Sequence, residues 1–192
     1  MTGVGHGDGQ ISPDVLAACR DGDRDALRAL YEAYKDKVYS IAFYFFHGDA
    51  AAAGDVTQQV FLKLIGGMAK YRGDSAFSTW LYRIVVNACV DRARRRKGEV
   101  ATTTEPAVLD AIPDSTASHD ELFARGEIAD SVQHAIAGLP PKLRFAILLR
   151  YFDELSYTDM AAALNCSIGT VSSRLSRAHR LLARKLAPLR TR

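Results

Sequence analysis

Apolar residues recur every three or four positions through most of the chain, which is the period of an amphipathic α-helix. In the N-terminal half this pattern predicts one helix that begins after Ser12, a second that begins after Asp23 and a third over residues 50–65. A fourth helix is predicted to begin near Ser78, with Ser78 as its N-cap. The positions expected to face the core include Leu30, Tyr31, Tyr34, Val56, Phe61, Leu64, Ile65, Leu81, Ile84, Val85, Ala88 and Cys89.

The same period returns in shorter segments in the C-terminal half. Helices are predicted over 122–137 and 140–152, and Ser156 is placed to cap a third, short helix. A turn at Asn165-Cys166-Ser167 then leads into a helix with Val171, Leu175, Ala178 and Leu182 facing inward. Two short helices joined by so tight a turn indicate a helix-turn-helix.

Residues 98–120 separate these two halves, because threonines, Pro106, Pro113 and scattered acids there show no periodicity. The predicted fold is therefore all-α, with two small helical domains over 11–97 and 121–192 joined by a flexible acidic linker over 98–120. Residues 1–10 are glycine-rich and are expected to form a flexible tail. Fully extended, the 23 residues of this linker could reach roughly 75 Å.

Composition excludes several classes of protein. With 192 residues, 48% of them hydrophobic, the chain can bury one good core or two small ones, yet it lacks an apolar run long enough to span a membrane. The N-terminus lacks a signal-peptide pattern, so a cytoplasmic location is expected. The three cysteines (Cys19, Cys89 and Cys166) are widely spaced, which argues against a disulfide framework and a zinc site. Buried thiols, no metal and no cofactor are expected.

Charge is distributed unevenly although the net charge is only +3. Residues 98–127 hold seven acids against Arg125 alone, whereas residues 170–192 hold seven basic residues and no acid. Such segregation is expected if two domains grip a polyanion while the connection between them avoids it.

The helix predicted after Ser78 carries a stripe of Trp80, Arg83, Asn87, Asp91 and Arg94 beside its core face, and it ends in a basic run over 92–97. Trp80 has two interpretations: it caps the edge of the core by packing on Ile84, or it is a platform for an unstacked base. The basic run exceeds what favourable interaction with the helix dipole requires, which favours nucleic acid.

The last predicted helix carries Thr170, Ser173, Arg177, Arg180 and Arg184 on one outward stripe, with Arg174 on its flank. Such a helix can read base edges in the major groove while its arginines grip phosphates. The alternative is a basic surface helix that merely closes a bundle. In contrast, the polar face of the helix over 50–65 is, by spacing alone, ordinary solvated surface.

Three segments, in order along the chain, resemble the extracytoplasmic-function (ECF) group of bacterial RNA polymerase sigma factors. DVTQQVFLKL at 55–64 is similar to the family's polymerase-binding helix, and RGDSAFSTWLYRIVVN at 72–87 to its promoter-melting segment that reads the minus-ten element. LSYTDMAAALNCSIGTVSSRLSRA at 155–178 resembles its helix-turn-helix for the minus-thirty-five element. The resemblance covers residues 12–97 and 121–187.

This resemblance implies a non-enzymatic protein without catalytic, cofactor or metal residues, whose partners are core RNA polymerase, promoter DNA and a dedicated anti-sigma protein. It assigns polymerase binding to Asp55, Gln58, Gln59, Phe61 and Lys63. It assigns the minus-ten element to Tyr71, Arg72, Asp74, Ser75, Phe77, Trp80, Arg83, Asn87 and Arg94. It assigns the minus-thirty-five element to Ser167, Gly169, Thr170, Ser172, Ser173, Arg174, Arg177 and Arg180.

The chain departs from relatives at three positions. Gln59 stands where many have glutamate, which alters the charge of the polymerase contact, and Ser172 and His179 stand where basic residues are common. The main rival interpretation is a stand-alone helix-turn-helix regulator with an N-terminal effector or dimerisation domain. An enzyme is a weaker rival, because the five histidines are scattered and accompany no nucleophile or phosphate-loop pattern.

Overall fold

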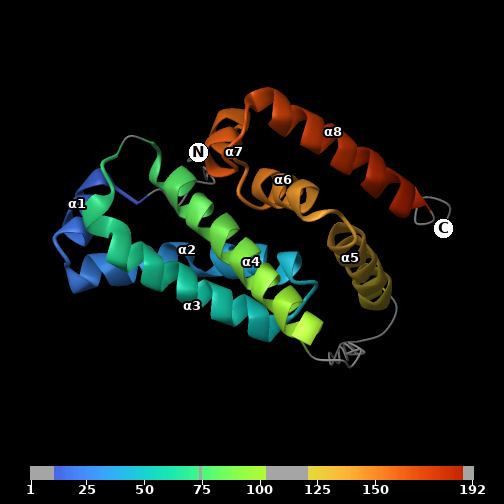
Figure 1. The fold of residues 1–192 in the computed structure, drawn as a ribbon, viewed down its shortest axis with the longest axis horizontal. Helices are drawn as coiled ribbons and strands as arrows, with labels where there is room; N and C mark the ends of the chain where they lie inside the picture. Colours follow the sequence, from blue (N-terminus) through green and yellow to red (C-terminus); the bar gives the residue numbers. More distant parts are fainter. Residues whose placement is uncertain (1–10, 74, 103–120, 188–192) are drawn as a thin grey trace, which may run out of the picture.

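The computed structural model describes residues 11–73, 75–102 and 121–187, and within these ranges it contains α-helices, one 3₁₀ turn and no strand (Figure 1). The all-α class expected from the sequence is confirmed. In order, the elements are α1 Pro13–Arg20, α2 Arg24–Phe45, α3 Ala50–Gly67, η1 Met68–Lys70, α4 Phe77–Thr102, α5 Glu121–Ala137, α6 Pro141–Phe152, α7 Tyr157–Ala163 and α8 Ile168–Lys185.

Side-chain caps fix where most of these helices begin. Asp23 accepts a hydrogen bond from the Ala26 N–H at 2.8 Å, and Asp49 accepts one from the Ala52 N–H at 2.9 Å. Ser12, Ser156 and Ser167 cap α1, α7 and α8 in the same way. Each cap satisfies a backbone donor that the first turn leaves without an intrahelical partner, so the predicted starts at Ser12, Asp23 and Ser156 are confirmed.

The predicted bounds of α4 need correction at both ends. The helix begins at Phe77, and the Ala76 carbonyl accepts the Trp80 N–H at 3.2 Å, so Ser78 lies inside the first turn and is not the N-cap. Its other end lies at Thr102, five residues into the segment predicted as linker. The predicted tail over 1–10, the rest of the linker over 103–120 and residues 188–192 lie outside the described residues.

The N-terminal helices α2, α3 and α4 lie side by side and bury the faces that their periodicity predicts (Figure 1). Val38, Ile41, Leu64 and Leu81 are completely buried. Two predicted core positions are wrong: Tyr31 is 42% exposed and Ile65 is 48% exposed. Both lie at the edge of the α2–α3 contact, where helical spacing alone does not separate buried from exposed positions.

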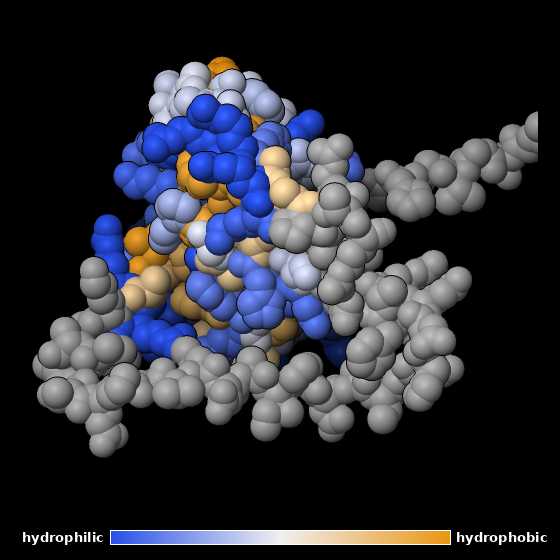
Figure 2. Space-filling view, turned by 90° about the vertical axis from the view of Figure 1, so that its right-hand side faces the viewer, coloured by the Kyte–Doolittle hydropathy of each residue, from blue (hydrophilic) through white to orange (hydrophobic). Residues whose placement is uncertain are grey.

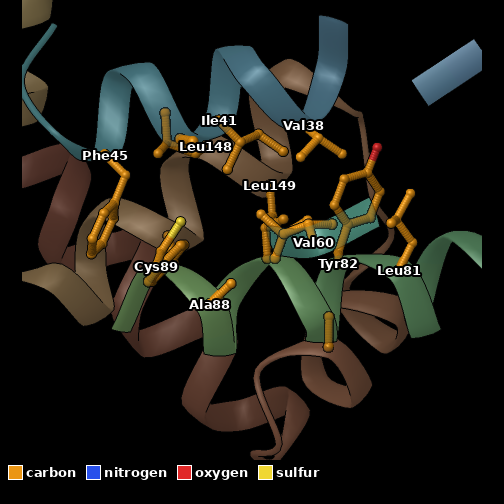
Figure 3. Close-up of a cluster of buried hydrophobic side chains, with 14 of the residues drawn as sticks. Val38, Ile41, Phe45, Val60, Leu81, Tyr82, Ala88, Cys89, Leu148 and Leu149 are labelled. Atoms are coloured by element: carbon orange, nitrogen blue, oxygen red, sulfur yellow. The ribbon is translucent and has the colours of Figure 1, made fainter. Parts of the chain in front are cut away.

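The middle of helix α6 is buried on every side, because all seven residues from Leu143 to Leu149 are buried. One of its faces packs on α8, and another packs on α2 of the N-terminal domain. Figure 3 shows Leu148 and Leu149 of α6 among Ile41 and Phe45 of α2 and Tyr82 of α4. The two domains therefore share one continuous hydrophobic core in this structure.

We predict that Leu149→Ala lowers the free energy of unfolding by about 3 kcal/mol, because it leaves a cavity in this shared core. Leu62→Ala is the matched control, since it removes the same atoms from a side chain that is 65% exposed. It should change stability by less than about 0.5 kcal/mol. Urea denaturation measures both, and equal losses would contradict the central position of α6.

Candidate nucleic-acid interface

Three aromatic rings meet where the η1–α4 loop enters α4. The rings of Tyr71 and Trp80 lie 5.1 Å apart at an interplanar angle of 32°, and Phe77 lies 5.8 Å from Trp80. The Tyr71 hydroxyl donates a hydrogen bond to the Ser75 carbonyl at 2.7 Å, which ties the loop to the cluster. Trp80 is half-buried and packs against the core, so it supports the core edge, as the first of its two interpretations expects.

The residues predicted for the minus-ten element divide into an exposed set and a buried one. Arg83 and Asn87 are exposed one turn and two turns beyond Trp80, and Arg72 and Ser75 are exposed on the loop. Phe77 is only 7% exposed and packs beneath Tyr71 and Tyr34, so it supports the cluster rather than offering a free face. Asp74 lies outside the described residues.

Helix α3 ends directly against this cluster. A Cβ atom placed on Gly67 would lie 3.2 Å from Cζ2 of Trp80, tighter than an ordinary van der Waals contact, whereas one placed on Gly66 would meet open space. The glycine at position 67 therefore lets α3 approach the indole ring closely.

The basic run on α4 has two separate roles. Arg92 pairs with Asp55 at 3.4 Å and Arg96 with Asp49 at 3.2 Å, so both arginines hold α4 to α3. Arg94 and Arg95 are exposed and form no ion pair within the described part of the chain. Only Arg94 and Arg95 of this basic run are thus directed to solvent, and they lie beyond Arg83 and Asn87 along α4.

Helices α7 and α8 form the predicted helix-turn-helix. Asn165 adopts a left-handed conformation with φ of 48° in the turn, which asparagine tolerates better than most residues. Ser167 then caps α8 by accepting the Thr170 N–H at 3.1 Å, and its hydroxyl also lies 2.9 Å from the Thr170 hydroxyl. The Ser173 hydroxyl donates to the Thr170 carbonyl at 2.9 Å.

The outward face of α8 is strongly basic. Arg177, Arg180 and Arg184 are exposed, Arg174 is half-buried, and Ser172 is exposed near the N-terminal end with Gly169. Because Thr170 and Ser173 use their hydroxyls within the helix, Ser172 and the arginines are the better placed side chains for contact with a duplex. Figure 2 views the end of the molecule where α5 and the last turns of α8 lie, and hydrophilic residues cover much of it.

Part of the predicted polymerase-binding face of α3 contacts α4. Asp55 pairs with Arg92, and Lys63 lies 3.7 Å from Asp91, so these two charges contact α4. Gln59 is half-buried, Gln58 is exposed, and Phe61 is only 4% exposed. Phe61 therefore forms part of the floor of this face rather than its rim.

An apolar groove between α2 and α3, which was not predicted from the sequence, lies beside Gln58. It encloses about 410 Å³ and is lined by Tyr31, Tyr39, Gly54, Thr57, Gln58, Phe61, Leu62 and Ile65. Leu62 is 65% exposed, and the Tyr31 ring meets Phe61 edge-on at 4.7 Å. The signal that could have revealed it is an apolar residue, Leu62, in the middle of an otherwise polar helix face.

Within the described residues, no group of three or more His, Cys, Asp or Glu side chains could hold a metal ion. Cys19 and Cys89 are buried and Cys166 is half-buried, and burial raises the pKa of Cys89 to about 12. That thiol is thus protonated at neutral pH. None of the helices in the described ranges combines the length and apolar character needed to cross a bilayer.

Comparisons with known proteins agree with this geometry. Residues 30–99 match the model of sigma-70 region 2, and residues 129–182 match that of sigma-70 region 4. The RNA polymerase sigma-H factor of Pseudomonas aeruginosa is 38% identical over 175 residues, which are 88% of this chain and 90% of that protein. The ECF RNA polymerase sigma-E factor of Escherichia coli is 35% identical over 188 residues, or 94% of this chain and 97% of that one. This chain belongs to the ECF group of the sigma-70 family.

Solved structures share the fold of this sigma factor. CnrH in complex with the cytosolic domain of CnrY superposes with a TM-score of 0.69 at 23% identity, covering 94% of this chain and 99% of that one. The sigma factor RpoE of Bartonella quintana, in complex with the anti-sigma factor NepR, gives 0.69 at 24% identity, covering 83% and 96%. The fold is therefore a known one.

The environment of Trp80 can be tested by fluorescence, because it is the chain's single tryptophan. We predict that Tyr71→Ala moves its emission maximum to longer wavelength, since removal of the neighbouring ring admits water to the indole. Tyr151→Ala, which removes a tyrosine that is 61% exposed on α6, should leave the maximum unchanged. An unchanged maximum in both variants would argue against the contact between the Tyr71 and Trp80 rings.

Proposed function

We propose that this sigma factor is a non-enzymatic specificity subunit that binds core RNA polymerase in the cytoplasm and directs transcription initiation to particular promoters. The observation that carries the proposal is the pairing of two exposed surfaces on one chain. One is the Trp80–Arg83–Asn87 stripe on α4, suited to single-stranded bases, and the other is the arginine face of α8, suited to duplex DNA.

The stripe on α4 is proposed to read and open the minus-ten element. Opening a duplex costs a few kcal/mol for each unstacked base, so the protein must offer compensating contacts to the single strand. Trp80 supplies a stacking surface, and Arg83 and Asn87 supply hydrogen-bond donors on the same side of the helix. The exposed Arg94 would contact the phosphate backbone beyond them.

Helix α8 is proposed to enter the major groove of the minus-thirty-five element. Ser172 lies near its N-terminal end for contact with base edges, while Arg174, Arg177 and Arg180 follow at spacings that suit bases and phosphates. The Ser167 cap and the Thr170 and Ser173 hydroxyl bonds hold the first turn of α8 in shape. Their proposed role is to position the helix rather than to contact bases.

The α2–α3 groove, together with Gln58 and Gln59, is proposed to bind the polymerase. An exposed apolar surface of this kind is uncommon on a monomeric protein unless a partner covers it. Leu62 and Ile65 are its most exposed apolar residues, and Asp55 and Lys63 form a charged margin toward α4. An anti-sigma protein is proposed as a second partner that competes for surfaces of this sigma factor.

Run-off transcription with purified core RNA polymerase on genomic promoter fragments tests the DNA roles. We predict that the native chain supports selective initiation and that Trp80→Ala lowers it about five- to hundredfold on duplex templates, since base stacking is worth roughly 1–3 kcal/mol. The loss should be smaller on a template opened beforehand around the minus-ten element. Lys142→Ala, an exposed change on α6, should have no effect. Specific duplex binding without core polymerase and without initiation would instead favour a stand-alone regulator.

The groove is tested by binding to core polymerase. We predict that Leu62→Glu weakens the complex at least about tenfold, because it buries a charge without a partner at an apolar contact. The folded state should tolerate the change, since Leu62 is 65% exposed. Titration of labelled sigma factor with core enzyme gives the affinity, with Lys142→Ala again as control. Undiminished affinity would place the polymerase contact elsewhere on the chain.

A further inference from the structure

The two flanks of helix α8, on either side of its outward stripe, differ in charge. One flank carries Arg174, whereas the other carries the exposed residues Ser172, Ser176, His179 and Ala183 at helical spacing. A major groove is about 12 Å wide and a helix with its side chains is about 10–12 Å across, so a helix seated in the groove has a phosphate backbone along each flank. On the flank without arginine, His179 is the one residue of these four that can carry a positive charge.

Tyr151, near the end of α6, holds the His179 ring. Helix α6 packs on α8 (Figure 1), and the Tyr151 hydroxyl lies 2.9 Å from Nε2 of His179. The two rings meet at 67° with their centroids 5.8 Å apart. Tyr151 is 61% exposed and His179 is exposed too, so the pair lies on the surface beside this flank. The ion pairs within the described residues do not include His179.

This hydrogen bond assigns different tasks to the two ring nitrogens of His179. Nε2 is engaged by Tyr151, which leaves Nδ1 as the nitrogen for a second partner. Phosphate oxygens only accept hydrogen bonds, so a phosphate at Nδ1 needs a proton there. Two forms of the ring supply it: the neutral tautomer in which the Tyr151 hydroxyl donates to Nε2, and the protonated ring in which the same hydroxyl accepts. Tyr151 is compatible with both forms.

We propose that His179, oriented by Tyr151, contacts a DNA phosphate along the flank of α8 that lacks arginine. Tyr151 is then a positioning residue, because it fixes a ring that would otherwise turn freely in solvent and so reduces the entropy lost on binding. The inference rests on the proposed function, since it adds a backbone contact to the minus-thirty-five element. Phosphate contacts fix the register of a helix in the groove without reading sequence, so the contact is expected at every promoter that this sigma factor uses.

A purely structural role for the pair makes different predictions. If Tyr151 and His179 served only to join α6 to α8, no single DNA phosphate would depend on the imidazole. Arginine at position 179 would then lose the contact with Tyr151 and would not maintain DNA binding. The two roles are therefore separated by the response to individual phosphates and by the behaviour of His179→Arg.

The first measurement is the affinity of holoenzyme, made from core RNA polymerase and the full chain, for a labelled promoter fragment. The fragment is one that the native chain selects in the run-off assay. We expect His179→Ala to weaken binding about two- to tenfold, which corresponds to the loss of one hydrogen bond. His134→Ala is the matched control and should leave the affinity unchanged, since His134 is exposed on α5 and its Nδ1 lies 2.8 Å from a carbonyl of its own helix.

Neutralisation of single phosphates tests whether the contact is direct. A methylphosphonate replaces one charged oxygen by a methyl group, and it is placed in turn at each phosphate of the minus-thirty-five element. At the contacted phosphate it should weaken binding of native holoenzyme by the same factor as His179→Ala does. It should have no further effect there on the His179→Ala holoenzyme, which stays sensitive at other phosphates. An equal response of the two holoenzymes at every phosphate would overturn the proposal.

The role of Tyr151 is tested with Tyr151→Phe, which removes the hydroxyl and keeps the ring. This change should weaken binding by no more than His179→Ala does. In a His179→Arg background, which should bind at least as tightly as the native chain, it should have no effect, because arginine reaches a phosphate without help from the hydroxyl. Weaker binding on Tyr151→Phe in both backgrounds would overturn the positioning role.

Failure of this inference and failure of the proposed function give different results. If native holoenzyme selects no promoter fragment, the proposed function has failed and this inference fails with it. If native holoenzyme selects a fragment and His179→Ala binds that fragment as tightly as the native chain, only the phosphate contact has failed.

Discussion

A single buried guanidinium holds together the end of α2, the α5–α6 turn and the beginning of α6. Arg144 is surrounded by carbonyl oxygens and by the Phe45 ring, and burial lowers its pKa without removing its charge. A charged group in such a place stabilises the fold only while its acceptors stay in position. The packing of the helix-turn-helix domain on the N-terminal helices therefore depends on the geometry of three backbone oxygens.

Local chemistry explains why so many element boundaries could be predicted from the sequence. Ser12, Asp23, Ser156 and Ser167 each accept a hydrogen bond from the N–H three residues further along the chain, so the signal and the structure it produces lie within one turn. The start of α4 was misplaced because the loop brings Phe77 into the aromatic cluster and the helix begins one residue before Ser78. Tertiary packing there outweighs the local capping preference of a serine.

In the candidate site, too, features set by local sequence could be predicted, whereas features set by tertiary packing could not. The placement of Trp80, Asn87 and Arg177 on outward stripes could be predicted, because helical spacing alone determines it. The α2–α3 groove could not be predicted, because Tyr31 and Ile65 fit the helical period of the core as well as the buried residues do. Only the packing of the two helices shows that these side chains face outward. The contact between α4 and α7 could not be predicted either: Thr79 and Asp159 are 80 residues apart, and nothing in either local sequence indicates the other.

Gly67 carries a consequence for how this sequence can vary over evolution. Its neighbour Gly66 faces open space, whereas any side chain at position 67 would press on the indole of Trp80. These two adjacent glycines thus differ in their tolerance of substitution, because Gly67, the last residue of α3, also lies against an aromatic ring. A substitution at position 67 would displace the Trp80 ring before it disturbed the helix. The residues at positions 67 and 80 are therefore expected to change together during evolution.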